Sequence, residues 1–260
     1  MPHSQDNADL AITGMACRFA GSDGLRAFWL RVLDGVPCFS DSPDPQAARF
    51  RDPQSVSFDR VTTLRAGYLG ALWEMHPASL GLNAATLAGT NPEHVLALEL
   101  AAQALKDAGY GEKPLPRERT AAILGYAPYM DPATVNWLQR GLVVDQTLDL
   151  VRRCFPHGST AQFEALRASL QGCLPDYDSR NLPGLLRHLI VGRVCARFDI
   201  QGPAYTVDAA CASALIALRA AADELRAGRA DLALCGGIQG FLSPQWLMPF
   251  SRLGLLSRHE

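Results

Sequence analysis

The sequence lacks an excess of charge of either sign. Its 24 Lys and Arg residues against 26 Asp and Glu residues leave a formal net charge of −2, and only 19% of the chain is charged. Proteins that bind nucleic acid or an anionic membrane surface commonly carry a basic excess. We therefore expect neither nucleic acid nor a membrane as a partner.

Long hydrophobic runs are also missing. The longest apolar stretch that only a serine interrupts, residues 209–218, is far shorter than the roughly 18 residues that a membrane helix needs. Residues 1–9 are polar and acidic, without the basic and apolar regions of a signal peptide. We expect a cytoplasmic protein with a short lead at 1–9 and one domain over 10–260.

The usual motifs for bound cofactors and metals are absent from the sequence. No two of the seven cysteines form a C-x-x-C pair, and the six histidines have no metal-ligand spacing. There is no H-E-x-x-H motif and no Gly-Lys-Ser/Thr phosphate loop. Residues 14–19 hold one of the three glycines of a dinucleotide fingerprint. We expect no cofactor and no metal ion.

What the chain does have is an alternation of strand and helix patterns. It is 48% hydrophobic, which excludes a disordered protein, and 260 residues can bury a large core. Short apolar runs predict buried strands, and apolar residues at helical spacing predict helices. Four strands separated by helices favour an α/β fold with a mostly parallel sheet and helices on both faces. The predicted strands are 10–14, 120–125, 205–209 and 232–236, and the predicted helices are 25–34, 92–108, 159–170, 182–198 and 211–227. Residues 37–64 are predicted to be irregular, and most of 126–181 gives no clear pattern.

One cysteine occupies a position that favours a reactive thiolate. Cys211 lies at the junction between the predicted strand 205–209 and the predicted helix 211–227. Unpaired N–H groups and the positive end of the helix dipole stabilise a thiolate there. Because no charge follows until Arg219, we expect this helix to be buried all round. Its N-terminus would then form a dry anion site, with the N–H of Cys211 as one oxyanion donor.

Two other interpretations of Cys211 remain open on position alone. It could be an ordinary core cysteine at a strand–helix junction. It could also be the nucleophile of a cysteine hydrolase. Ala209 and Ser213 occupy the places of the two glycines of a nucleophile elbow, which speaks against an α/β-hydrolase.

Several segments resemble the β-ketoacyl synthases, the condensing enzymes of fatty-acid and polyketide synthesis. The segment Thr206-Val-Asp-Ala-Ala-Cys211-Ala-Ser-Ala-Leu215 is similar to their active-site segment. Other similar segments follow in family order: 11–19, 28–35, 90–99 with 104–109, Gly192-Arg193, Gly202-Pro203, 231–237 and 251–257. The Ala-Ala-Cys-Ala form is more similar to iterative polyunsaturated-fatty-acid and enediyne ketosynthases than to modular ones. The family's Phe-Pro-Gly is Phe19-Ala-Gly21 here.

The resemblance implies a thiolase-like fold, of which this chain is the N-terminal half, and an acyltransferase activity. Cys211 would accept an acyl chain from the phosphopantetheine of an acyl carrier protein, and a decarboxylated malonyl-type unit would then attack the thioester. The family's two histidines, in a His-Gly-Thr-Gly-Thr segment and a later Gly-His segment, are absent from this sequence. We therefore expect a C-terminal ketosynthase half as partner, in the same chain or another, a dimer, and no condensation by this chain alone.

Three hypotheses follow. The first is a ketosynthase N-terminal half that is active when completed. The second is a catalytically silent interaction or scaffold subunit of a synthase assembly, in which Cys211 is unused. The third is an unrelated cysteine acyltransferase or hydrolase, which would need a histidine near Cys211.

Overall fold

Three strands form a parallel sheet in the order β4–β3–β5. The computed structural model describes residues 9–70, 80, 91–127, 130–176, 182–186 and 188–257. The strands are β3 (Thr120–Tyr126), β4 (Ala204–Val207) and β5 (Leu232–Ile238). Ile123 of β3 lies opposite Tyr205 of β4 and Cys235 of β5. Because the strands are parallel, their carboxyl ends lie along one edge of the sheet.

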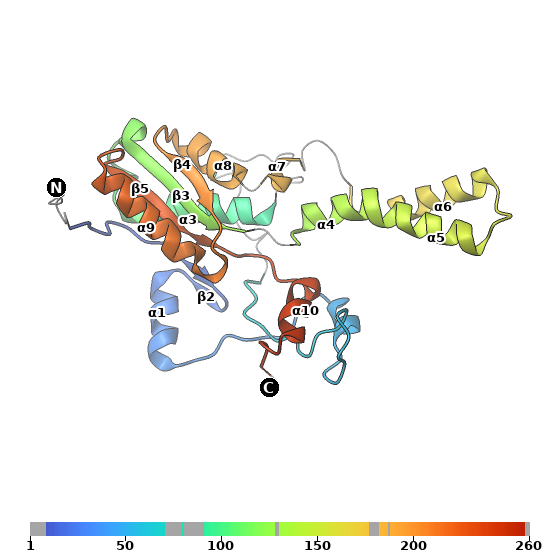
Figure 1. Cartoon of the computed structure of the whole chain (residues 1–260). Helices are drawn as coiled ribbons and strands as arrows, with labels where there is room; N and C mark the ends of the chain where they lie inside the picture. The colour runs from blue at the N-terminus through green and yellow to red at the C-terminus, as the bar shows by residue number, and fades with distance from the viewer. Residues whose placement is uncertain are drawn as a thin grey trace, which may run out of the picture.

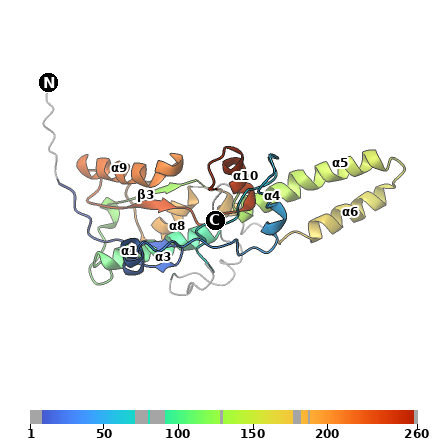
Figure 2. The ribbon, with the colours of Figure 1, turned by 90° about the horizontal axis from the view of Figure 1, so that it is seen from below.

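Helices cover both faces of this sheet (Figures 1 and 2). Helix α9 (Ser213–Arg226) packs on one face, and α3 (Pro92–Asp107) and α8 (Leu189–Phe198) lie on the other. Every residue of β3 is buried, as expected for a central strand with helices on both sides. The predicted α/β fold with a mostly parallel sheet is therefore confirmed.

The core divides into one apolar cluster on each face of the sheet. On the α3 and α8 side, Leu98, Ile190 and Val194 are almost fully buried. On the α9 side, Ile123 packs against Ala217 and Ala221. Burying one large aliphatic side chain stabilises a fold by about 1.5–3 kcal/mol. The small alanines bring α9 close to the sheet, which matters for the site described below.

The N-terminal region and the last helix lie beside this α/β layer (Figure 1). A short antiparallel hairpin precedes the first helix, whose predicted C-cap Gly35 is left-handed at φ 63°. The predicted irregular segment 37–64 contains one short 3-10 helix, packed near α10 through Leu247. The elements are β1 (Arg18–Phe19), β2 (Ser22–Asp23), α1 (Leu25–Asp34), η1 (Ala47–Phe50), η4 (Arg117–Arg119) and α10 (Pro244–Arg252).

A helical arm projects from the body between β3 and α7 (Leu182–Leu185) (Figure 1). One side is α4 (Pro132–Leu138), the π-helix η5 (Gln139–Val143) and α5 (Val144–Cys154); the other is α6 (Thr160–Gly172). An ion pair of 2.6 Å between Arg167 Nη1 and Asp145 Oδ1 joins the two sides. Ser159 and Gln162 form a capping box that starts α6, which confirms the helix predicted there.

The segment predicted as a first strand is not a strand. Residues 10–14 pair with no other strand in the described part of the chain. The chain is held instead against the end of α3: Met15 N donates to Asp107 Oδ2 at 2.9 Å. A Cβ on Gly14 would lie 2.5 Å from Ala104 O, so only glycine allows this approach.

The helix predicted over 182–198 is broken into α7 (Leu182–Leu185) and α8, because i to i−3 bonds such as Leu189 N to Leu186 O replace the regular ladder. No helix in the ranges described above is long and apolar enough to cross a bilayer.

Candidate active site

Cys211 lies at the carboxyl edge of the sheet, between β4 and α9. It is the middle residue of η6 (Ala210–Ala212), a single 3-10 turn that leads directly into α9. The sequence analysis predicted Cys211 at this strand–helix junction, and the helix proper begins two residues later than expected, at Ser213. The first N–H groups of α9 therefore lie next to the turn that holds the thiol.

The turn that carries Cys211 is fixed by local hydrogen bonds. Ala210 has φ 49°, a left-handed conformation that costs a non-glycine residue energy unless its neighbours hold it. Ser213 Oγ accepts from Ala209 N at 2.9 Å and donates to Ala210 O at 2.7 Å. Asp208 Oδ1 accepts from Ala210 N at 3.1 Å. The strained residue directly precedes the cysteine, and these hydrogen bonds hold it in place.

Two glycines let the start of α9 come close to the sheet. A Cβ on Gly125 of β3 would lie 2.5 Å from Ser213 C and 2.8 Å from Ala214 N. A Cβ on Gly237 of β5 would lie 2.7 Å from Ala214 Cβ. Gly125 and Gly237 are paired in register, so a patch without side chains receives the first turn of α9. This close contact sets the position of the turn that holds Cys211.

The surroundings of Cys211 differ from the sequence-based expectation in one respect. We predicted a helix that is buried all round and a dry anion site. Cys211 is instead exposed, and Leu215 of α9 is 71% exposed. Ile216 and Leu218 are exposed as well. Only the sheet-facing side of α9, with Ala217 and Ala221, is buried, because no described element covers its other side.

The seven cysteines fall into different environments. Burial raises the pKa of the thiols of Cys17, Cys195 and Cys235, which makes them poor nucleophiles at neutral pH. Cys154 and Cys173 are exposed like Cys211, but they lie at the ends of α5 and α6 on the projecting arm. Among the exposed cysteines, Cys211 alone lies at the N-terminal end of a helix packed on the sheet.

A buried polar network lies at the same edge of the sheet. Glu93, in the first turn of α3, accepts from the Tyr126 hydroxyl at 2.8 Å and from Gly240 N at 2.6 Å. Burial raises the pKa of Glu93, and burial together with the Glu93 carboxylate raises the pKa of Tyr126. Asn91 Nδ2 donates to the same hydroxyl at 3.4 Å. These bonds fasten α3 and the loop after β5 to the end of β3. The sequence analysis predicted this helix over 92–108 but predicted no polar network.

His94 is the buried histidine of this region. It is fully buried, its two ring nitrogens have no hydrogen-bond partner, and its ring meets Tyr126 edge-on at 6.2 Å. Burial, with a smaller effect of Arg193, lowers its pKa to about 4. In the described ranges Cys211 has no hydrogen-bonded histidine, so the arrangement gives no support to a cysteine hydrolase. Nor do three or more His, Cys, Asp or Glu side chains of those ranges form a metal-binding group.

The model of the β-ketoacyl synthase N-terminal domain matches residues 7–260, almost the whole chain. The chain belongs to the β-ketoacyl synthase family. It is similar to a phenolphthiocerol/phthiocerol polyketide synthase of Mycobacterium tuberculosis, with 29% identity over 95% of this chain and 12% of that protein. It is also similar to the polyketide synthase ThaG of Burkholderia thailandensis, with 26% identity over 96% of this chain and 4% of that protein.

Solved ketosynthases share the fold. The oxazolomycin ketosynthase domain of Streptomyces albus superposes with a TM-score of 0.67 at 21% identity, over 95% of this chain and 38% of that one. The ketosynthase from module 6 of the bacillaene synthase of Bacillus subtilis gives 0.66 at 20% identity, over 95% and 35%. The chain thus spans a minor part of each of these relatives, and its fold is the N-terminal part of a ketosynthase of the polyketide synthase type.

Proposed function

We propose that this ketosynthase N-terminal domain carries the acyl-accepting nucleophile of a decarboxylative condensation, and that the nucleophile is Cys211. The observation that supports it is the turn at Cys211. A strained Ala210, the Ser213 hydroxyl and the contact of α9 with Gly125 together hold one exposed thiol at the start of a helix. Strained backbone residues cluster at active sites, and a thiol at the start of a helix is favoured as a nucleophile.

The first step is a thiol–thioester exchange. The sulfur of Cys211 attacks the carbonyl carbon of an acyl thioester, and the bond from that carbon to the phosphopantetheine sulfur of the acyl carrier protein breaks. The proton lost from Cys211 ends on the released thiol, so the exchange is balanced without an oxidant or reductant. In the second step a malonyl-type unit loses CO2, and its carbanion attacks the carbonyl carbon of the acyl-Cys211 thioester. The bond from that carbon to the sulfur of Cys211 breaks, which releases the thiolate of Cys211. Two easier steps replace one difficult step.

We also propose that the second step needs a C-terminal ketosynthase half. The histidines that the family uses for decarboxylation are absent from this sequence, and His94 is buried. The exposed side of α9, with Leu215, Ile216 and Leu218, is an apolar surface of the kind that a partner covers. Covering it would also exclude water from the turn at Cys211, which would supply the dry site that the described residues lack.

Acylation of the purified chain tests the assignment of Cys211. The chain is incubated with an acyl thioester of N-acetylcysteamine and, in parallel, with an acyl carrier protein loaded with the same acyl group. Peptide mapping by mass spectrometry then locates the acyl group. We expect Cys211 to be acylated faster than any other cysteine. The Cys211→Ala variant should not be acylated at the rate that Cys211 shows in the wild type.

Cys173→Ala is the matched control, because Cys173 is also exposed but lies on the arm. This variant should be acylated like the wild type. If Cys154, Cys173 and Cys211 were acylated at equal rates, exposure alone would explain the labelling. If Cys211 were untouched while other thiols reacted, the scaffold interpretation would be favoured instead.

A further inference from the structure

Glu93 is a buried carboxylate to which the proposed reaction gives no role. It is 2% exposed, and it accepts hydrogen bonds from the Tyr126 hydroxyl to Oε2 at 2.8 Å and from Gly240 N to Oε1 at 2.6 Å. A Cβ on Gly240 would lie 3.1 Å from Glu93 Cγ, so the loop after β5 passes directly over this side chain. Burial of a carboxylate costs free energy that an apolar side chain in the same place would not cost. The bonds that Glu93 makes therefore call for a function.

The two partners of Glu93 lie at the ends of neighbouring strands. Tyr126 is the last residue of β3, and Gly240 follows the end of β5 by two residues. Tyr126 pairs in register with Ile238, the last residue of β5. Glu93, in the first turn of α3, therefore joins the carboxyl ends of β3 and β5 to each other.

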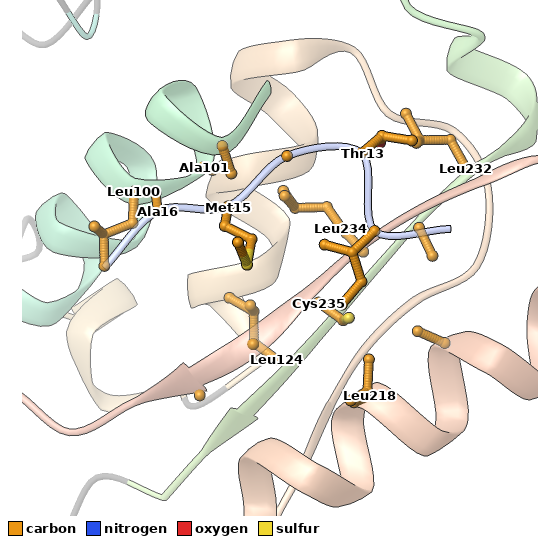
Figure 3. A pocket seen from close by; sticks show the side chains of 18 of the residues that line it. Thr13, Met15, Ala16, Leu100, Ala101, Leu124, Leu218, Leu232, Leu234 and Cys235 are labelled. Carbon is orange, nitrogen blue, oxygen red and sulfur yellow. The ribbon is translucent and has the colours of Figure 1, made fainter. Parts of the chain in front are cut away.

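The opposite face of the same strand ends receives the first turn of α9. In Figure 3, α3 with Leu100 and α9 with Leu218 lie on opposite sides of these strands. Successive residues of a strand face opposite sides of the sheet, so Gly125 faces α9 while Tyr126 faces α3. We name Gly125 of β3 and Gly237 of β5, which pair in register, the glycine patch.

A continuous series of contacts leads from Glu93 to Cys211. Each partner of Glu93 lies within three residues of a glycine of the patch. The patch lies against the backbone at Ser213, as described above. The Ser213 hydroxyl in turn accepts from Ala209 N and donates to the carbonyl oxygen of Ala210, the residue before Cys211. A change in the separation of the two strand ends would therefore move the turn that holds the thiol.

We propose that Glu93 is a positioning residue for the acylation of Cys211: by joining the ends of β3 and β5 it holds the glycine patch, and with it the turn that presents the thiol to an acyl thioester. The inference rests on the proposed function, because it needs Cys211 as the acyl acceptor. Glu93 itself takes part in no bond that forms or breaks. Attack on a carbonyl carbon requires a closely defined position of the sulfur, and a misplacement of about 1 Å can slow such a step by about 100-fold.

Asn91 determines that the group at position 93 must be a carboxylate. Asn91 Nδ2 donates to the Tyr126 hydroxyl oxygen at 3.4 Å, and this hydroxyl donates onward to Glu93. Asn91 Oδ1 accepts from Glu93 N at 2.9 Å, which fixes the orientation of the amide. A glutamine amide at position 93 would use its one oxygen for Gly240 N and turn a second N–H toward the hydroxyl. The hydroxyl proton would then have no acceptor.

An exchange of the two groups restores all three bonds with two of them reversed. In the double variant Asn91→Asp with Glu93→Gln, the amide at 93 donates to the Tyr126 hydroxyl, and the hydroxyl donates to the carboxylate at 91. Gly240 N keeps an oxygen acceptor at 93. Asn91→Asp alone directs two buried carboxylates at one hydroxyl proton, which is unfavourable because like charges repel. Each single substitution should therefore impair the network, and the double variant should repair it.

The rate of Cys211 acylation in four proteins tests the proposal. The wild type, Glu93→Gln, Asn91→Asp and the double variant are incubated with an acyl thioester of N-acetylcysteamine, and peptide mapping follows the acylation of Cys211. We expect each single variant to react about 10-fold more slowly than the wild type, and the double variant to react within about 3-fold of it. Alkylation of Cys211 by iodoacetamide needs only an accessible thiolate, so its rate should change by less than about 2-fold. A double variant as slow as the single variants would overturn the proposal.

Glu99→Gln is the matched control. It makes the same change on the same helix, at a half-buried carboxylate whose partner at 2.9 Å is Arg18 of the N-terminal hairpin. Urea unfolding measures the stability of each variant, and only Glu93→Gln should slow acylation. Tyr126→Phe cuts the connection to β3 alone, so it should also slow acylation and serves if Glu93→Gln does not fold. Unchanged acylation in Tyr126→Phe, or equal slowing in Glu99→Gln, would contradict a positioning role.

The same rates separate this inference from the proposed function. If the wild type were not acylated at Cys211, the proposed function would be rejected, and this inference with it. If the wild type were acylated and all four proteins reacted at equal rates, the positioning role of Glu93 alone would be rejected, and Cys211 would remain the nucleophile.

Discussion

The substitution Gly125→Ala tests whether the close contact between β3 and α9 holds the turn at Cys211. The added Cβ would lie 2.5 Å from Ser213 C, 2.6 Å from Ser213 O and 2.8 Å from Ala214 N. All three are backbone atoms, so no side chain can rotate away. The first turn of α9 must move off the sheet, and with it the turn that contains Cys211.

The structure allows the size of the effect to be stated. Overpacking of a tight core costs about 1–3 kcal/mol, and the rigid neighbours place this site at the upper end, at about 3 kcal/mol. Domains are stable by about 5–15 kcal/mol, so we expect the variant to fold with clearly reduced stability. Because the turn shifts, the rate at which acyl thioesters modify Cys211 should also fall.

Urea unfolding of the purified chain measures this cost, and two other glycines serve as comparisons. Gly237→Ala meets Ala214 Cβ at 2.7 Å and should also be destabilised. Gly236→Ala, one residue earlier, meets nothing within 4 Å and should change the free energy of unfolding by less than about 1 kcal/mol. If Gly125→Ala were as stable as Gly236→Ala, with Cys211 equally reactive, α9 would not be held in the way we describe.

Three further predictions concern the turn, the exposed helix face and pH. Ser213→Ala removes the acceptor of Ala209 N, so urea unfolding should show a loss of about 1–3 kcal/mol; an unchanged midpoint would contradict this. Leu215→Asp should leave the unfolding free energy of the chain alone within about 0.5 kcal/mol, because the side chain is exposed, but should prevent docking of a C-terminal half, as measured by co-purification. His94 has its pKa lowered from 6.5 to about 4, so the unfolded chain binds its proton first as the pH falls. The wild type should therefore lose about 2 kcal/mol more stability than His94→Leu between pH 7 and pH 5, and equal losses in urea unfolding would refute the shift.

The sequence predicted the layers of the fold well, because each layer is encoded locally. The buried strand 120–125 and the helices 25–34 and 92–108 have the apolar spacing and the terminal glycines that mark their limits. The position of Cys211 between strand and helix was predicted for the same reason. These features depend on residues that are close in the sequence, so the local sequence pattern is sufficient to predict them.

Most of the features that the sequence analysis missed or predicted incorrectly depend on distant residues. The segment 10–14 has a strand-like sequence, but a strand forms only with a partner, and the structure leaves a cavity between it and β5. The helix after Cys211 was predicted to be buried because it is apolar, yet nothing described covers Leu215. The arm helix α5 was missed because its polar face dominates its composition. The network of Glu93, Tyr126 and Gly240 joins three separate segments, so no local pattern indicates it.

The most direct test of the central claim is the formation of a β-ketoacyl product. An acyl carrier protein loaded with an acyl group and a second loaded with a malonyl group are supplied to three proteins: the chain alone, the fusion with a C-terminal ketosynthase half, and the fusion with Cys211→Ala. We expect product from the unsubstituted fusion only, because Cys211 holds the acyl group and the second half supplies the histidines. Product formed by the chain alone, or by the Cys211→Ala fusion at the rate of the unsubstituted one, would contradict the claim.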